Sequence, residues 1–390
     1  MTDQRLRLCF IAHGESTHTH KWLNFFARRG HEVHLVPFMS SDQDCLLGVL
    51  DPSVKIHPSV SGFPIRRWKL TLGEVRRLRA LLRDHRIDLL HALFVGPNAW
   101  YACLTRFRPL VLTVMGGGDL SLNWKPSTLS ERWLTPRALW NADLVTCWSR
   151  RLVEATRRYR PPGSVIPVTH VGVDLQLFRR VHYPEKVREQ LKVPPSARIV
   201  LSARRIRPLS NIDVLARSIP RILEQVPETW FLFVQPFASD PDCRRTIEDI
   251  IRSQGVGERV RFVPGASQEE MPSFYSAADV SVSIGLLDGT PITALESMAC
   301  ETPVVLSDDL SDYEGHLFAP DRTVAIAAPR DPAAVAAAIL RVLQDKAYRK
   351  RLVAGGLEVV QQYCGYTEQM GRMERLYLDL VYSPQRRGSA

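Results

Sequence analysis

The segment from Ser283 to Val305 holds residues whose types and spacing fit the binding of a charged, hydroxyl-rich ligand. A short apolar run precedes a loop that carries Asp288 and Gly289. Thr290 is a good N-cap, and Pro291 is a good first residue for the helix that follows. The start of a helix offers free amide groups and the positive end of the helix dipole. We therefore expect this helix start to cradle an anion such as a diphosphate.

Two carboxylates belong to the same segment. Asp288 lies just before the expected helix, and Glu296 lies within it. Carboxylates beside a diphosphate repel it, but they are useful where they accept hydrogen bonds from the hydroxyl groups of a ribose or a sugar. The pattern thus fits a nucleotide-sugar, and a capped surface helix with two unrelated acids is the alternative.

Short apolar runs alternate with amphipathic stretches along the chain, beginning with a strand at Arg7–Ala12, a helix at Thr19–Arg29 and a strand at Glu32–Pro37. This alternation predicts parallel sheets that are covered by helices on both faces. The rhythm breaks at residues 171–185 and then restarts. We therefore predict an α/β protein with two Rossmann-like, doubly wound domains facing a central cleft, where ligands bind at the carboxyl ends of the strands. The expected domains span residues 1–180 and 181–365, and a closing helix and tail span residues 366–390.

Composition is that of a soluble globular protein: of 390 residues, 45% are hydrophobic and 24% are charged. The formal net charge is +10, and basic residues cluster at residues 66–69, 76–86 and 150–160. These clusters fit attraction to an anionic membrane surface or acceptor, and solvated helix faces are the alternative interpretation. We expect no nucleic-acid partner, because no known reader module accompanies the charge.

The seven cysteines are scattered and form no CxxC pair, so we expect neither a disulfide framework nor a zinc knuckle. No small-residue cleavage region follows the N-terminal residues, and the apolar runs are too short to span a membrane. These features favour a cytoplasmic protein. The basic clusters would place it peripherally on the inner face of the membrane.

The segment from Asp288 to Val305 resembles the signature of the family 4 glycosyltransferases of the GT-B fold. That signature has two glutamates separated by seven residues, a helix of small residues, a glycine and Pro-Val-Val, and Asp288 stands in place of the first glutamate. Asp288 and Glu296 have this spacing, whereas Glu301 stands where glycine is usual, which points to a different turn after the helix. The resemblance extends over nearly the whole chain through the segments Phe10–Trp22, Asp88–Ala92, Leu112–Asp119, Val171–Asp174 and Glu269–Asp279.

The resemblance implies roles for residues of the second domain. Glu296 would grip the nucleotide ribose, Asp288 would contact sugar hydroxyls, and Arg204 would neutralise the donor diphosphate. The residues that we expect to bind the donor are Gly14, Arg204, Arg205, Val263, Gly265, Asp288, Gly289, Thr290, Ile292, Thr293 and Glu296. The family's companion lysine is missing, since residues 209–211 read Leu-Ser-Asn, and Arg205 or Arg207 is the candidate substitute.

The acceptor side departs further from the family, because Met115 stands where many relatives have a histidine. Methionine cannot exchange protons, so we expect Asp119 to orient the acceptor and to act with Arg204 and Asp288 as the catalytic set. Further acceptor-side candidates are His18, His91, Met115 and Gly117. For the histidines, packing or hydrogen bonding is the alternative to proton transfer.

By resemblance the chain is thus an enzyme, a retaining glycosyltransferase of polysaccharide or glycolipid biosynthesis. It would move a sugar from a nucleotide-diphosphate donor, by default a UDP-sugar, to a hydroxyl acceptor such as a glycan, a glycolipid or a small molecule. It would need no metal and no cofactor, because the Asp42-Gln-Asp44 and Asp240-Pro-Asp242 triplets are better explained as loops or helix caps. The resemblance also implies that the closing helix crosses back to the first domain. Two alternatives stay open: a nucleotide-sugar epimerase on the same fold, and a catalytically silent protein that binds nucleotide-sugars or glycans.

Overall fold

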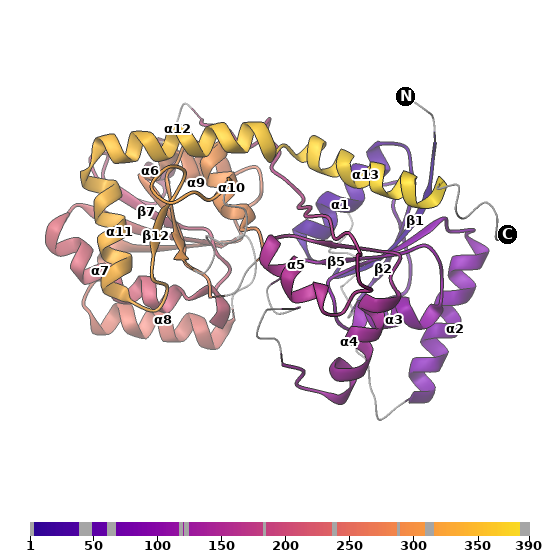
Figure 1. Ribbon diagram of the computed structural model, residues 1–390. Helices are drawn as coiled ribbons and strands as arrows, with labels where there is room; N and C mark the ends of the chain where they lie inside the picture. Colours follow the sequence, from indigo (N-terminus) through magenta and orange to yellow (C-terminus); the bar gives the residue numbers. More distant parts are fainter. Residues whose placement is uncertain are drawn as a thin grey trace. The chain divides into compact units, whose positions relative to one another are not determined.

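The chain forms two units in the computed structural model, which describes residues 4–38, 49–60, 68–116, 120, 125–181, 185–235, 240–286, 289–308 and 316–382. Unit 1 comprises Met1–Val171 with Thr367–Ala390, and unit 2 comprises Gly172–Tyr366. Each unit is built on its own six-stranded parallel sheet with helices on both faces (Figure 1). The α/β fold class predicted from the alternating pattern is confirmed.

The sheet of unit 1 has the strand order β3-β2-β1-β4-β5-β6. Its strands are β1 (Arg7–Ala12), β2 (Glu32–Pro37), β3 (Lys55–Ile56), β4 (Leu89–Leu93), β5 (Leu110–Val114) and β6 (Leu144–Cys147). β1 lies between its two neighbours, so that Leu8 pairs with Val33 on one side and with Leu89 on the other. Every residue of β4 and β5 is buried, as expected for strands that are covered on both faces.

The helices of unit 1 are α1 (Thr17–Arg28), α2 (Trp68–Asp84), α3 (Pro97–Thr105), α4 (Leu129–Asn141), α5 (Arg150–Arg157) and α13 (Tyr366–Tyr382). α2, α3 and α4 cover one face of the sheet, and α1 and α13 cover the other (Figure 1). α13 is the end of the chain, yet it packs on residues from the beginning of it. The Tyr377 ring stacks on Phe26 with 5.0 Å between centroids, and Glu374 forms an ion pair of 2.9 Å with Arg29.

The sheet of unit 2 has the order β12-β11-β10-β7-β8-β9. Its strands are β7 (Arg198–Ser202), β8 (Thr229–Gln235), β9 (Val260–Pro264), β10 (Val280–Ser283), β11 (Val304–Ser307) and β12 (Ala325–Ala327). Its helices are α6 (Glu185–Gln190), α7 (Ile212–Gln225), α8 (Pro241–Ser253), α9 (Met271–Ala277), α10 (Ile292–Ala299), α11 (Pro332–Gln344) and α12 (Lys346–Tyr363). α7, α8 and α11 pack on one face around a core that includes Ile219, Phe231 and Ile339, and α9, α10 and α12 lie on the other.

The chain passes from unit 1 to unit 2 at Val171–Gly172, before the boundary that we expected at residue 180. The chain crosses between the units twice, and hydrogen bonds join the two unit 2 segments that lie next to these crossings. Val173 donates its amide hydrogen to Cys364 O at 2.7 Å, and Tyr366 donates to Val173 O at 2.8 Å. Within the described part of the chain, no helix is long and apolar enough to cross a membrane.

Candidate functional site

The carboxyl edge of the unit 2 sheet contains a reversal of strand order between β10 and β7. β7 continues to β8 on one side, and β10 continues to β11 on the other, so the two connections diverge at this point. Ligands of doubly wound sheets bind at such a point. Ser202 ends β7 and Ser283 ends β10, and both hydroxyl groups are buried without a hydrogen-bond partner among the described residues. This edge therefore offers buried polar groups for a ligand.

Arg204 follows β7 and is 8% exposed. Its guanidinium lies against the loop after β10, where a Cβ atom at Gly285 would meet Arg204 Nη2 at 2.8 Å and Leu209 O at 3.3 Å. The glycine thus leaves room for a buried positive charge. A buried guanidinium at this edge of the sheet is a suitable group to bind an anion.

Residues 209–211, which stand where a lysine was expected, hold that same loop by hydrogen bonds. Leu286 donates its amide hydrogen to Leu209 O at 2.9 Å, and Asn211 Nδ2 donates to Ile284 O at 3.2 Å. These residues position the backbone beside Arg204 and add no charge to it. The positive charge of this region comes from the arginines.

Glu296 lies in α10, where it is 7% exposed and accepts a hydrogen bond of 3.3 Å from the Tyr275 hydroxyl group. Burial raises the pKa of Tyr275 well above its usual range, the negative charge of Glu296 raises it further, and the positive charge of Arg204 opposes the shift. The phenol is therefore protonated and close to both charges. Tyr275 was not among the residues predicted to bind the donor. Tyr275 and Glu296 lie on different helices, so their spacing in the sequence gave no sign that they are in contact.

The start of α10 differs by one residue from the prediction. Pro291 is the N-cap and the helix begins at Ile292, so the assignment of Thr290 as N-cap and Pro291 as first helical residue was wrong. The reason is that Pro291 has an extended ψ of 93°, so its own backbone is not helical. The first intrahelical bond runs from Ala294 N to Pro291 O at 2.9 Å. The amide groups of Ile292 and Thr293 precede this bond, and no acidic residue stands in the first turn, so an anion can bind there.

The other residues predicted to bind the donor have more varied positions. Gly289 and Thr290 are buried, whereas Arg205 is exposed. Val263 pairs with Val234 in the sheet, and Gly265 adopts a positive φ of 69° just after β9. Asp288 lies outside the described residues. Asp240 accepts hydrogen bonds from the amide groups of Asp242 and Cys243 at the start of α8, as expected for a helix cap.

In unit 1, His91 of β4 is buried inside a chain of hydrogen bonds. Its Nε2 bonds to Thr113 Oγ1 at 2.8 Å, Thr113 bonds to Thr146 at 2.8 Å, and His91 Nδ1 bonds to the Tyr377 hydroxyl group. Burial lowers the pKa of His91 to about 3, so the ring is neutral. Both ring nitrogens are used to join β4 to β5 and α13, which favours the packing interpretation over proton transfer.

His18 and His20 lie in the first turns of α1. The His20 ring bonds through Nε2 to Gly14 O, and the His18 ring meets Trp148 edge-on with 4.8 Å between centroids. Burial lowers the pKa of His18 to about 3. The Nδ1 atoms of both rings are buried and have no hydrogen-bond partner among the described residues. They are neutral groups that could still bind a hydroxyl.

Met115 is buried, 4% exposed, just after β5, and the next residue, Gly116, adopts a φ of 88° that glycine favours. Gly117 and Asp119 lie outside the described residues. The place where many relatives have a histidine is therefore apolar in this chain.

Two family models match consecutive parts of the chain. Residues 12–177 match Glycosyltransferase Family 4, and residues 184–358 match Glycosyl transferases group 1. The chain belongs to family 4 of the GT-B glycosyltransferases. The first matched segment covers unit 1 up to Val171 and continues into the first residues of unit 2. The second covers most of unit 2, including Arg204, Tyr275 and Glu296.

Relatives of this family 4 member include the D-inositol 3-phosphate glycosyltransferase of Thermobispora bispora, with 27% identity over 85% of this chain and 83% of the relative. The chain spans about half the length of several other relatives of that name. Among solved structures, sucrose-phosphate synthase from Thermosynechococcus elongatus has a TM-score of 0.80 and 22% identity over 96% of this chain and 99% of the other. Anabaena HepE in complex with UDP-glucose has a TM-score of 0.76 and 16% identity over 96% and 100%. At these identities the structural likeness establishes the fold.

Glu301 is the departure from the family pattern that the structure explains most directly. It adopts a left-handed φ of 58°, the conformation that glycine favours. Glu301 donates its amide hydrogen to Met298 O and Thr302 donates to Ser297 O, each at 3.0 Å. This bond pattern is that of a Schellman motif. Glu301 thus adopts the backbone conformation that glycine favours, and the hydrogen bonds at the end of α10 hold it in place.

Proposed function

We propose that this chain is a retaining glycosyltransferase, which moves a sugar from a nucleotide-diphosphate donor to a hydroxyl acceptor. The observation that carries the proposal is the group of three buried residues at the carboxyl edge of the unit 2 sheet: Arg204, Tyr275 and Glu296. Glu296 accepts a hydrogen bond from Tyr275, and the charges of Glu296 and Arg204 shift the pKa of Tyr275 in opposite directions. Arg204 suits a diphosphate, and Glu296 suits the hydroxyl groups of a ribose. The UDP-glucose bound to the Anabaena neighbour supports a UDP-sugar as donor.

In this proposal the donor is held by opposite charges at its two ends. The Arg204 guanidinium and the amide groups of Ile292 and Thr293 bind the diphosphate, while Glu296 accepts hydrogen bonds from the ribose. Negative charge on the diphosphate grows as the sugar departs, so Arg204 stabilises the transition state more than the bound donor. The reaction needs no metal ion or cofactor, because these groups supply the positive charge.

The acceptor step uses no protein base at residue 115. The departing diphosphate takes the proton of the acceptor hydroxyl, so Met115 does not prevent transfer. Asp288 contacts the sugar hydroxyls, and Asp119 orients the acceptor. The buried nitrogens of His18 and His20 are further groups for an acceptor hydroxyl. Acceptors with a hydroxyl group on a glycan, a glycolipid or an inositol-like ring fit this proposal, the last because of the names of the relatives.

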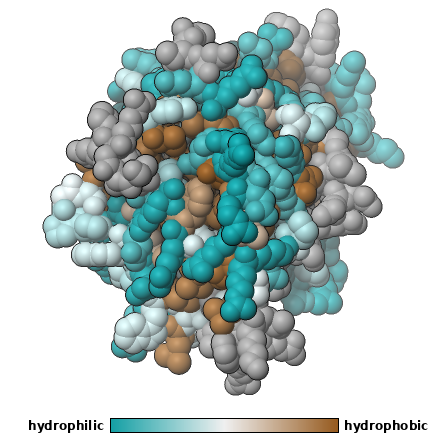
Figure 2. Space-filling view, turned by 90° about the vertical axis from the view of Figure 1, so that its right-hand side faces the viewer, coloured by the Kyte–Doolittle hydropathy of each residue, from teal (hydrophilic) through white to brown (hydrophobic). Residues whose placement is uncertain are grey.

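We also propose that unit 1 attaches to an anionic membrane surface. α2 and the turn after it expose Arg76, Arg83 and Arg86. Figure 2 faces the side of the molecule that lies at the right of Figure 1, and the coloured part of this side carries many hydrophilic side chains with hydrophobic ones between them. The six cysteines that the structure describes form no disulfide bond, which fits a reducing cytoplasm.

Substitution at the two charged residues tests the donor site. We expect Glu296→Gln to weaken UDP binding by about 1.5–3 kcal/mol, because the ribose hydroxyls lose a charged acceptor. Arg204→Ala should lower the turnover number more than it lowers UDP affinity. Calorimetry with UDP and assays of nucleotide release measure the two effects. The control is Arg217→Ala, which changes an exposed arginine of α7 in the same unit and should leave both quantities unchanged.

A panel of UDP-, GDP- and ADP-sugars separates this proposal from its rivals. Slow release of nucleotide from one donor, accelerated by an acceptor, supports a glycosyltransferase. An isomerised sugar would identify an epimerase, and binding without turnover would identify a silent binding protein. Either result would overturn the proposal, as would unchanged UDP affinity in Glu296→Gln.

A further inference from the structure

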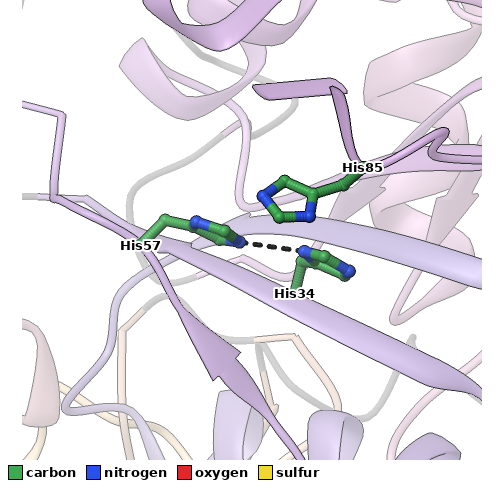
Figure 3. Close-up of side chains that lie close together, drawn as sticks. All are labelled: His34, His57 and His85. Atoms are coloured by element: carbon green, nitrogen blue, oxygen red, sulfur yellow. Dashed lines mark hydrogen bonds between the residues drawn. The ribbon is translucent and has the colours of Figure 1, made fainter. Parts of the chain in front are cut away.

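Three histidines of unit 1 come together at the edge of its sheet (Figure 3). His34 lies in β2, His57 follows β3, and His85 follows α2. One ring nitrogen of each lies within 4.8 Å of the other two. The ring centroids are 5.1, 4.7 and 5.0 Å apart for the pairs 34–57, 34–85 and 57–85. The proposed sugar transfer uses none of these residues.

The backbone fixes the positions of all three. His34 pairs with Lys55 across the parallel strands, so His57, two residues further on, points to the same face of the sheet as His34. The amide hydrogen of His57 is donated to Leu35 O at 2.8 Å. His85 stands at the end of α2, where Arg86 is left-handed with a φ of 49° and Ile87 donates to Leu82 O at 2.9 Å. The three rings are thus brought together by the sheet register and by the helix end.

Glu32 sets the tautomer of the buried His34 ring. His34 Nε2 lies 3.0 Å from Glu32 Oε1, and because a carboxylate only accepts, Nε2 carries the proton. His34 Nδ1 therefore presents its lone pair toward His57 Nε2, at 2.9 Å. A carboxylate that orients a histidine in this way is the usual outer partner of a metal-bound imidazole. In the absence of metal, His57 Nε2 donates its proton to His34 Nδ1.

The cluster lies at the margin of the core of unit 1. His34 is buried, and His57 and His85 are half-buried. Lys55 pairs with Glu32 at 2.5 Å, which offsets its charge near the cluster.

We propose that His34, His57 and His85 bind a divalent transition-metal ion, zinc in the first place, with a fourth position for water. Imidazole nitrogens suit zinc, whereas magnesium and calcium prefer oxygen ligands. With Zn–N bonds of about 2.0–2.1 Å, two ligand nitrogens of a tetrahedral site lie roughly 3.4 Å apart. The nitrogens here are 2.9 Å apart in one pair and all within 4.8 Å, so small rotations of the side chains complete the site.

The ion would stabilise the edge of the unit 1 sheet at β3. β3 has only two residues, Lys55–Ile56, and is the outermost strand of its sheet. A bound ion would tie the residue after β3 to β2 and to the end of α2. The role is therefore structural, and it concerns a unit that does not contain Arg204 or Glu296.

The test uses the purified full chain after dialysis against a chelator. Titration with Zn²⁺ alone, followed by calorimetry, should show one ion per chain from this site and a rise in Tm, and Mg²⁺ should produce neither. His57→Gln and His85→Gln change half-buried rings, so these variants should fold. Each should weaken zinc binding by at least the roughly 10–100-fold that loss of an outer partner costs, and Glu32→Gln should weaken it by about that amount. His316→Gln, an exposed histidine of unit 2, is the matched control and should change nothing.

Two results would overturn the proposal. One is the absence of stoichiometric zinc binding by the wild-type chain. The other is equal zinc affinity and an equal rise in Tm in His57→Gln, His85→Gln and the wild type, which would place the ion elsewhere. Circular dichroism of each variant before titration distinguishes a lost ligand from a lost fold.

Discussion

Glu301 shows how a single residue can hold an unfavourable backbone conformation. A left-handed φ of 58° brings the Cβ atom close to the following carbonyl group, which costs a non-glycine residue roughly 1–2 kcal/mol. The conformation persists because the amide groups of Glu301 and Thr302 satisfy carbonyl groups at the end of α10. The strain therefore lies at the end of the same helix that carries Glu296.

We predict that Glu301→Gly raises the free energy of unfolding by up to about 1 kcal/mol, because glycine removes the strain but adds entropy to the unfolded chain. Urea unfolding followed by circular dichroism measures the change. Glu301→Ala keeps the Cβ atom and removes the charge, and it should give no such gain. A gain as large in alanine as in glycine would show that the charge of Glu301, and not its backbone, is unfavourable.

At the same scale, His91 illustrates why a histidine near a strand end is not by itself a catalytic candidate. Its two ring nitrogens bond to Thr113 and to Tyr377. Burial holds its pKa near 3, so a proton carrier at this position would work only in strong acid. His91 instead links two strands to the last helix of the chain.

At the scale of elements, the two crossings between the units depend on Gly172. Its φ is 72°, and a Cβ atom there would meet Cys364 O at 2.8 Å and the Tyr366 Cα atom at 2.9 Å. These are backbone atoms held by the hydrogen bonds of Val173, so they cannot move aside as a side chain would. Glycine at this position lets the segment after unit 1 lie directly against the segment that leads into α13.

We predict that Gly172→Ala lowers the midpoint of urea unfolding through two effects: the left-handed backbone and the clash with Cys364. Gly255 is the matched control, because it has a φ of 67° in the same unit with nothing within 4 Å of the added Cβ atom. Gly255→Ala should lose only the backbone part, about 1–2 kcal/mol. Gly172→Ala should lose roughly 1–3 kcal/mol more. Equal losses in the two variants would show that the segments separate without cost.

At the scale of the whole molecule, the net charge of +10 is spread unevenly. Arg76 and Arg83 of α2 are exposed, whereas Arg77 is tied to Glu74 and to the carbonyl groups of Pro58 and Ser59. Exposed arginines can approach a surface of lipid headgroups, and arginines with internal partners hold the fold. Arg66 and Arg67, which belong to the same basic cluster of the sequence, lie outside the described residues.

We predict that the protein binds vesicles containing phosphatidylserine at low salt and is released at high salt. The physical reason is that the screening length falls from about 30 Å at 0.01 M salt to about 3 Å at 1 M. Arg76→Glu and Arg83→Glu should each weaken binding by about 1 kcal/mol or more, roughly fivefold or more, in a vesicle sedimentation assay. Arg217→Glu, on α7 of unit 2, should weaken it less. Binding that is equal at both salt concentrations, or absent at low salt, would contradict an electrostatic attachment.

The amino-acid sequence determined the fold class and much of the candidate donor site. Apolar runs such as Arg7–Ala12 indicate buried strands, and the alternation of such runs with amphipathic stretches restarts after residue 185. Alternating strands and helices can bury their apolar faces in only a few architectures. The existence of α10 and the place of Glu296 within it follow from local spacing within one segment. Local patterns of this kind are legible because they depend on residues that are near one another in the chain.

The tertiary structure alone decided the contacts between elements. Three such contacts join segments that are far apart in the sequence and share no pattern. They are the hydrogen bond between Tyr275 and Glu296, the close approach of Arg204 to Gly285, and the cluster of His34, His57 and His85. Which residues face each other across two strands depends on strand order and register, and a shift by one residue would turn His57 to the other face of the sheet. The one-residue error at Pro291 arises because proline fixes only φ, and the ψ angle of 93° that it adopts is extended.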